Sequence, residues 1–172
     1  YIRRLKTCPY IWLGENMTQD EYFMRQAVIQ ARLAAKRDEV PVGAVIVKDG
    51  VIIARGRNTR ENAHDPAGHA EINALRRAAK KLGGWNLHHC ELYVTLEPCP
   101  MCAGAAINAR LARIIYGAAD KKAGACGSKL NLCDAELKFN HIPGVTGGVL
   151  EEECALLLTQ YFKLKRRKKE ER

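Results

Sequence analysis

The chain has 172 residues, 47% of them hydrophobic, and its 28 basic and 19 acidic side chains give a formal net charge of +9. This length suits one well-packed core and is short for two ordinary domains, and no apolar run approaches the roughly 20 residues that a membrane-spanning helix needs. Seven cysteines, two of them in a Cys-x-x-Cys, favour a reduced, cytoplasmic protein with a metal site over a secreted disulfide framework.

The positive charge is concentrated at the ends of the chain. Residues 163–172 carry a net +5 and residues 1–16 a net +2, so the remainder is nearly neutral. A near-neutral domain with a basic end is typical of proteins that bind a polyanion. The alternative is a solvated helix end, since acidic residues 151–153 precede the basic cluster and together they complement a helix dipole. The pattern leaves both interpretations open.

The first predicted helix follows an irregular N-terminal extension, residues 1–16. Thr18, followed three residues later by Glu21, is the signature of a capping box, and an apolar stripe continues to about Lys36. We expect Met17 to be the natural start, in which case a chain lacking the extension should still fold and act.

A hairpin and a second helix come next. Two β-rich runs, residues 42–47 and 51–54, flank Asp49-Gly50, a dipeptide favoured in two-residue hairpin turns. After a polar loop, one apolar face predicts a helix over residues 69–82, which Gly83-Gly84 ends.

Strands and helices alternate in the second half. The pattern predicts a strand at 92–96, a helix from Pro100 to about Ala109, a strand at 113–116, a short edge strand at Val145-Thr146 and an amphipathic helix at 154–164. Residues 118–150 are otherwise glycine-rich and have the least clear pattern. The element order predicts one α/β domain over residues 17–165, followed by a basic end at 166–172. We expect a mixed, mostly five-stranded sheet with helices on both faces, which is a three-layer αβα arrangement.

Two short segments carry residues suited to metal chemistry. His69 and Glu71 open one predicted helix, and Cys99 and Cys102 open another. Zinc prefers His and Cys ligands, and three protein ligands leave its fourth position open for water. The dipole at a helix N-terminus favours the thiolate forms that bind metal, and a carboxylate beside the site can move protons. The sequence therefore predicts one Zn²⁺ per subunit, with Glu71 as the catalytic residue.

The Cys-x-x-Cys pair alone would also be typical of a redox pair or of half a structural zinc site. The upstream His-x-Glu and the strand-to-helix position of Pro98 favour a hydrolytic site instead.

These two segments, taken together, resemble the motifs of a known family. His69-Ala70-Glu71 with Pro98-Cys99-Pro100-Met101-Cys102 resembles the signature of the zinc-dependent cytidine deaminase superfamily. Within that superfamily the chain, from about Thr18 to Arg166, resembles the bacterial tRNA-specific adenosine deaminases. The supporting segments are Glu39-Val40-Pro41-Val42-Gly43-Ala44, Gly56-Arg57-Asn58, His64-Asp65-Pro66, Thr95-Leu96-Glu97-Pro98, Gly117-Ala118-Ala119-Asp120, Gly124-Ala125-Cys126-Gly127-Ser128, Asn140-His141 and Tyr161-Phe162-Lys163-Leu164-Lys165-Arg166.

The resemblance implies a cytidine-deaminase-like fold, a homodimer, and hydrolytic conversion of the wobble adenosine of a tRNA anticodon stem-loop to inosine, with release of ammonia. In the implied mechanism Glu71 moves a proton from the attacking water to N1 of adenine. The other roles that it implies are a hydrogen bond from Asn58 to the base, packing of Val42 against the base, a nucleotide channel lined by His64, Asp120 and Asn140, and phosphate contacts from Lys165 and Arg166.

Simpler structural roles compete with these assignments. Asn58 can close a turn after its strand, Val42 can be strand core, and Asp120 can cap the turn that follows it. Two rival functions also remain. One is a deaminase of a free base or nucleoside, of the guanine or cytidine type. The other is a non-catalytic, zinc-stabilised RNA-binding module with Cys126 or Cys133 as a fourth ligand.

Overall fold

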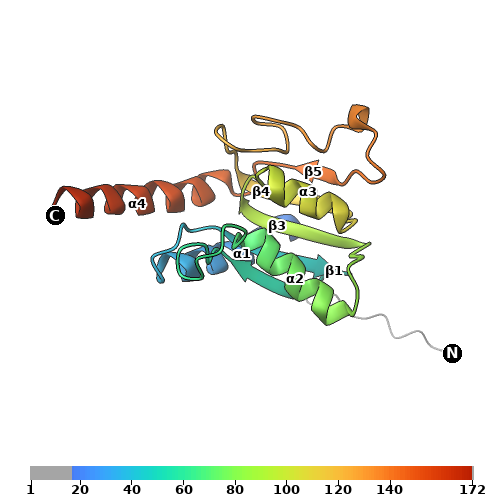
Figure 1. Cartoon of the computed structure of the whole chain (residues 1–172), viewed down its shortest axis with the longest axis horizontal. Helices are drawn as coiled ribbons and strands as arrows, with labels where there is room; N and C mark the ends of the chain where they lie inside the picture. The colour runs from blue at the N-terminus through green and yellow to red at the C-terminus, as the bar shows by residue number, and fades with distance from the viewer. Residues whose placement is uncertain (1–16, 172) are drawn as a thin grey trace.

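The computed structural model describes residues 17–171, so the expected extension 1–16 lies outside the described residues. The elements, in chain order, are α1 (Gln19–Ala35), β1 (Gly43–Lys48), β2 (Val51–Arg57), α2 (Ala70–Leu82), β3 (Cys90–Leu96), α3 (Pro100–Asn108), β4 (Arg113–Ala118), the short 3-10 helix η2 (Ala135–Leu137), β5 (Gly144–Thr146) and α4 (Glu151–Glu170) (Figure 1). The capping box predicted at the start of α1 is present, with Thr18 and Glu21 each bonding the other's backbone N–H.

The five strands form one mixed sheet in the order β2-β1-β3-β4-β5. Strand β1 is antiparallel to both β2 and β3, whereas β3, β4 and β5 are parallel. The β1–β2 hairpin turns at Asp49 and Gly50, whose φ angles of 50° and 73° are both positive, as this two-residue turn requires. The predicted mixed five-stranded sheet is confirmed.

Strand residues alternate between two hydrophobic cores, one on each face of the sheet. Ala44, Ile46 and Leu92 contribute to the core that α2 and α3 cover. Their neighbours in sequence, among them Val45 and Tyr93, contribute to the core beneath α1 and the start of α4. Because side chains along a strand point alternately to opposite faces, this distribution confirms the three-layer αβα arrangement.

Helix α4 is longer than its apolar pattern predicts. It starts at Glu151 and continues to Glu170, and its second half extends away from the sheet (Figure 1). Beyond Leu164 the helix has no core to pack on, so the apolar periodicity stops. Its lysines, arginines and glutamates are nevertheless good helix formers. Within residues 17–171, no helix has both the length and the apolar character needed to cross a membrane.

Gly56 allows α2 to lie directly on strand β2. A Cβ atom at this position would clash with the carbonyl oxygen of Ala70, in the first turn of α2, and would also press on Ala74. This close approach fixes the start of α2, where His69 and Glu71 lie.

Gly56→Ala should therefore lower the free energy of unfolding by about 3 kcal/mol, because the backbone of α2 cannot move away without disturbing a close-packed core. Gly84→Ala is the matched control: a Cβ atom there has no neighbour within 4 Å, so its effect should stay within about 0.5 kcal/mol. Urea unfolding monitored by circular dichroism measures both variants. Equal stability of the two would show that the contact at Gly56 is not a constraint.

Candidate active site

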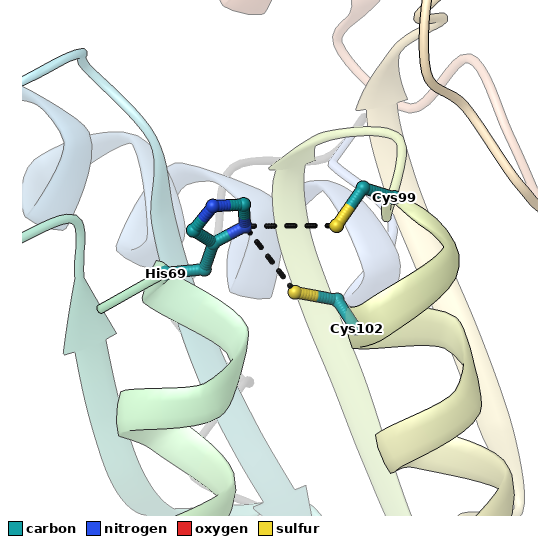
Figure 2. Close-up of side chains that lie close together, drawn as sticks. All are labelled: His69, Cys99 and Cys102. Atoms are coloured by element: carbon teal, nitrogen blue, oxygen red, sulfur yellow. Dashed lines mark hydrogen bonds between the residues drawn. The ribbon is translucent and has the colours of Figure 1, made fainter. Parts of the chain in front are cut away.

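The predicted metal ligands lie where two helices begin. His69 is the N-cap residue of α2, Cys99 is the N-cap residue of α3, and Cys102 lies in the first turn of α3. Strands β2 and β3 are both antiparallel to β1, so they run in the same direction and end at the same edge of the sheet. Each is followed by its helix on the same face, and this topology brings the two helix N-termini together (Figure 2).

The ligand atoms are spaced as a tetrahedral zinc ion would require. His69 Nδ1 lies 3.6 Å from Cys99 Sγ and 3.5 Å from Cys102 Sγ. Bond lengths of about 2.3 Å to sulfur and 2.05 Å to nitrogen, at a tetrahedral angle, separate the ligand atoms by about 3.6 Å. The three residues therefore fit zinc in both chemistry and spacing.

Proton sharing prepares the cysteines for a metal. A hydrogen bond from Cys102, aided by the interaction with His69, lowers the pKa of Cys99 to about 4 against the opposing effect of burial. The hydrogen bond to Cys99, followed by burial, raises the pKa of Cys102. The lowered pKa of Cys99 favours the thiolate form that binds metal, and metal binding would displace the proton of Cys102.

Glu71 lies in the first turn of α2 and is only 4% exposed. Burial raises the pKa of Glu71 to about 7, against the opposing effects of a backbone hydrogen bond and of His69. A carboxyl group with this pKa can both accept and release a proton at neutral pH, which is what a proton shuttle requires.

A cavity of about 180 Å³ opens beside these groups. Its lining brings together six of the predicted site residues: Val42, Asn58, His69, Glu71, Cys99 and Asp120. His64 and Asn140 are exposed on loops and are not among the lining residues, so their assignment to a nucleotide channel stays a prediction. Arg60, which no sequence pattern indicated, also lines the cavity.

Lys165 and Arg166 lie on α4. Lys165 Nζ is 2.6 Å from Asp38 Oδ2, and the hydroxyl of Tyr161 donates to the backbone carbonyl of Asp38 at 2.8 Å. Lys165 therefore helps to hold α4 against the loop before β1, whereas Arg166 is exposed. Together with Lys122 and the exposed ring of Phe162 they line a basic hollow.

Glu97 organises the loop on the far side of the cavity. Its buried carboxylate accepts hydrogen bonds from the backbone N–H groups of Asp120, Cys126 and Ser128. Burial opposes ionisation, but these hydrogen bonds outweigh it and lower the pKa of Glu97. Glu97 is therefore fully engaged, which leaves Glu71 as the carboxyl group free for proton transfer. The carboxylate of Asp120 accepts from the N–H groups of Lys122 and Ala123, so its turn-capping role is present as well.

Cys126 and Cys133 do not join the metal ligands. Across residues 17–171, the one group of three or more potential ligands close enough to share an ion is His69, Cys99 and Cys102. A fourth protein ligand, which the non-catalytic module would need, is thus missing from the described part of the chain.

The chain is similar in sequence to known proteins. The family model of MafB19-like deaminases matches residues 17–151. A tRNA-specific adenosine deaminase of Bacillus subtilis is 48% identical over 153 residues, which cover 89% of this chain and 94% of that protein.

Two solved structures are also similar. One, from work on A-to-I editing by tRNA:A34 deaminases at the wobble position of transfer RNA, has a TM-score of 0.76 and 45% identity and covers 80% of this chain and 99% of that one. A guanine deaminase from Bacillus subtilis has a TM-score of 0.56 and 46% identity and covers 58% of this chain and 64% of that one.

Fold, site and family model together define a deaminase. The identities over nearly the full length of the relatives are more specific: the chain belongs to the tRNA-specific adenosine deaminase family.

Glu97→Gln should loosen the loop that Glu97 holds, because a neutral amide replaces a charged acceptor of three N–H groups. We expect hydrogen exchange at the amides of residues 120, 126 and 128 to accelerate about tenfold to a hundredfold, as loss of charge-assisted bonds would produce. Glu136→Gln, the same change at an exposed side chain, is the control. Mass-spectrometric exchange that is equally slow in both variants would contradict the anchoring role.

Proposed function

We propose that this protein hydrolyses the wobble adenosine of a tRNA anticodon to inosine and releases ammonia. The observation that carries the proposal is the spacing of His69, Cys99 and Cys102 beside the buried carboxyl group of Glu71. The spacing suits zinc with an open position, and Glu71 is placed to move protons. The substrate is inferred from the tRNA-specific relatives.

His69, Cys99 and Cys102 would hold one Zn²⁺ per subunit. When bound, zinc supplies a water whose pKa is lowered toward about 7. Glu71 accepts a proton from the attacking water and delivers it to N1 of adenine. The C6–O bond then forms. Glu71 accepts the second proton of the attacking water, now on the C6 hydroxyl, and passes it to the amino group, so that the C6–N bond breaks and ammonia leaves.

The cavity would receive the base alone. An adenine stacked within an RNA loop cannot reach so small and recessed a site, so it must be splayed out. Asn58 would bind the base by hydrogen bonding and Val42 by packing, since both line the cavity. Arg166 and Lys165 would contact phosphates of the anticodon stem, and a phosphate that engages Lys165 must compete with Asp38. We also propose a homodimer, as the family resemblance implies.

A tRNA anticodon stem-loop with adenosine at the wobble position should gain about 1 Da, the mass change from amine to hydroxyl. Glu71→Gln should slow this reaction by at least about a thousandfold, because it removes the proton shuttle, yet should retain zinc and RNA binding. Mass spectrometry, metal analysis and RNA-binding titration on the same preparations measure the three properties.

Cys126→Ser is the matched control and should keep both zinc and activity, whereas Cys102→Ser should lose zinc. Release of zinc by Cys126→Ser would show a closed site and refute the hydrolytic proposal. Rapid deamination of free guanine or cytidine, with the stem-loop untouched, would reassign the substrate.

A further inference from the structure

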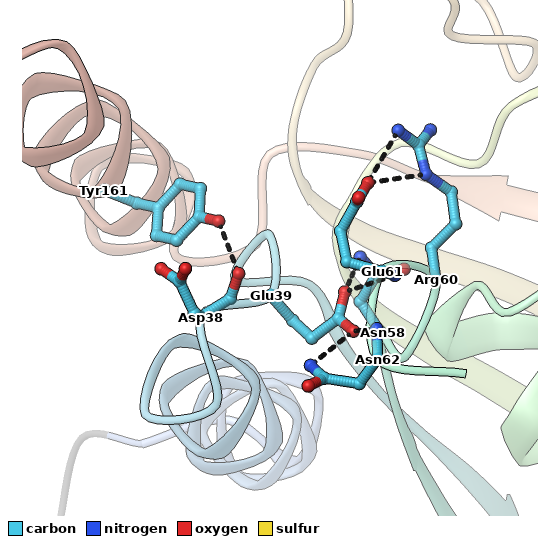
Figure 3. Close-up of polar contacts among 7 residues, drawn as sticks. All are labelled: Asp38, Glu39, Asn58, Arg60, Glu61, Asn62 and Tyr161. Carbon is cyan, nitrogen blue, oxygen red and sulfur yellow. Dashed lines mark hydrogen bonds and ion pairs between the residues drawn. The ribbon is translucent and has the colours of Figure 1, made fainter. Parts of the chain in front are cut away.

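Glu39 is a buried carboxylate beside the cavity that the proposed reaction does not use. It lies in the loop before β1 and is only 1% exposed. Its two oxygens accept hydrogen bonds from the backbone N–H groups of Glu61 and Asn62, at 3.2 and 2.7 Å, and from the side-chain amide of Asn62 at 2.7 Å. Figure 3 shows the side chain of Glu39 extending toward Asn58, Glu61 and Asn62.

The remaining contact is with a residue that lines the cavity. Asn58 Nδ2 donates to Glu39 Oε2 at 3.3 Å, and Asn58 itself is 7% exposed. An ionised carboxylate is an acceptor only, so the atom of the Asn58 amide that faces it must be the nitrogen. A glutamine at position 39 would lack this restriction, because an amide can present either a donor or an acceptor.

The orientation of Asn58 determines what it offers to a ligand. Among the hydrogen bonds of residues 17–171, none occupies Asn58 Oδ1, and the residue lines the cavity beside Glu71. With Nδ2 held by Glu39, the planar amide directs its carbonyl oxygen away from Glu39. The carbonyl oxygen is therefore available as an acceptor for a base that contacts Asn58.

We propose that Glu39 is a positioning residue that fixes the side-chain amide of Asn58 so that Oδ1 accepts a hydrogen bond from the 6-amino group of the bound adenine. This inference rests on the proposed function. The 6-amino group is the hydrogen-bond donor that adenine offers, whereas inosine, the product, carries a carbonyl acceptor at the same carbon. The fixed amide thus favours the substrate over the product and promotes product release.

The segment that carries Glu39 is itself held in place. Asp38, the preceding residue, has a positive φ of 62° and is tied to α4 through Tyr161 and Lys165. Glu39 is thus fixed by α4 on one side and by residues 61 and 62 on the other.

The test compares binding of two anticodon stem-loops, one with adenosine and one with inosine at the wobble position, to the zinc-loaded protein. Glu71→Gln is present throughout, so that no substrate turns over. We expect the Glu71→Gln protein to bind the adenosine stem-loop about tenfold more tightly than the inosine stem-loop, which is the scale of one well-placed hydrogen bond. Adding Glu39→Gln should reduce the ratio to within about twofold, because the amide of Asn58 can then turn.

Matched variants separate orientation from general stability. Glu39→Asp keeps an acceptor-only group and should retain the preference, as should Asn62→Ala, which removes a different partner of Glu39. Asn58→Ala should also abolish the preference, and it tests the role of the amide independently of whether Glu39→Gln folds. Thermal unfolding and metal analysis check that every variant is folded and zinc-loaded.

A preference that survives Asn58→Ala, or that survives Glu39→Gln in a folded protein, would overturn the inference. Failure of the proposed function can be told apart from failure of this inference. If the proposed function were wrong, the protein with Glu71 intact would form no inosine in the stem-loop.

Discussion

Two helices, α2 and α3, begin at the same edge of one sheet, and the site depends on this constraint. The sheet order places β2 and β3 on either side of β1 and running in the same direction, so the helices that follow them start side by side. Gly56 allows α2 to approach β2, which fixes the position of His69. As a result, His69, Cys99 and Cys102 meet at zinc spacing although about 30 residues separate the two segments.

Three buried glutamates near the cavity have different roles because their surroundings differ. Glu39 and Glu97 each accept several N–H groups, which lower their pKa values despite burial. Burial dominates for Glu71, and its pKa rises to about 7. Such a difference in surroundings is how proteins assign a proton-transfer role to one carboxyl group among several. Here the two ionised carboxylates position Asn58 and the 120–128 loop, and the third is available for chemistry.

Local sequence patterns predicted most of the fold and the centre of the site. The capping box at Thr18, the hairpin at Asp49-Gly50 and the β-rich run at 42–47 each follow from neighbours in sequence, and the structure contains all three. The three candidate metal ligands could be predicted to lie together because their residue types and their positions at helix starts are both visible in the sequence.

The supporting interactions could not be predicted in the same way. The hydrogen bonds of Glu39 and Glu97 join segments about 20 to 30 residues apart, and no periodicity reports them. The available signals at Glu39 were a charge just ahead of an apolar segment and its place in one of the segments that carry the family resemblance, and neither identifies its partners. The sequence pattern also could not show that Lys165 pairs with Asp38, or that α4 continues past the last turn that packs on the core.

The central claim is that water, activated beside Glu71, replaces the amino group of adenine. The direct measurement is the mass of the wobble nucleoside after reaction in ¹⁸O-labelled water. The account predicts a gain of about 3 Da, in place of about 1 Da in ordinary water. The Glu71→Gln variant should show no such gain. An unchanged mass, or the same rate of ¹⁸O incorporation without Glu71, would contradict it.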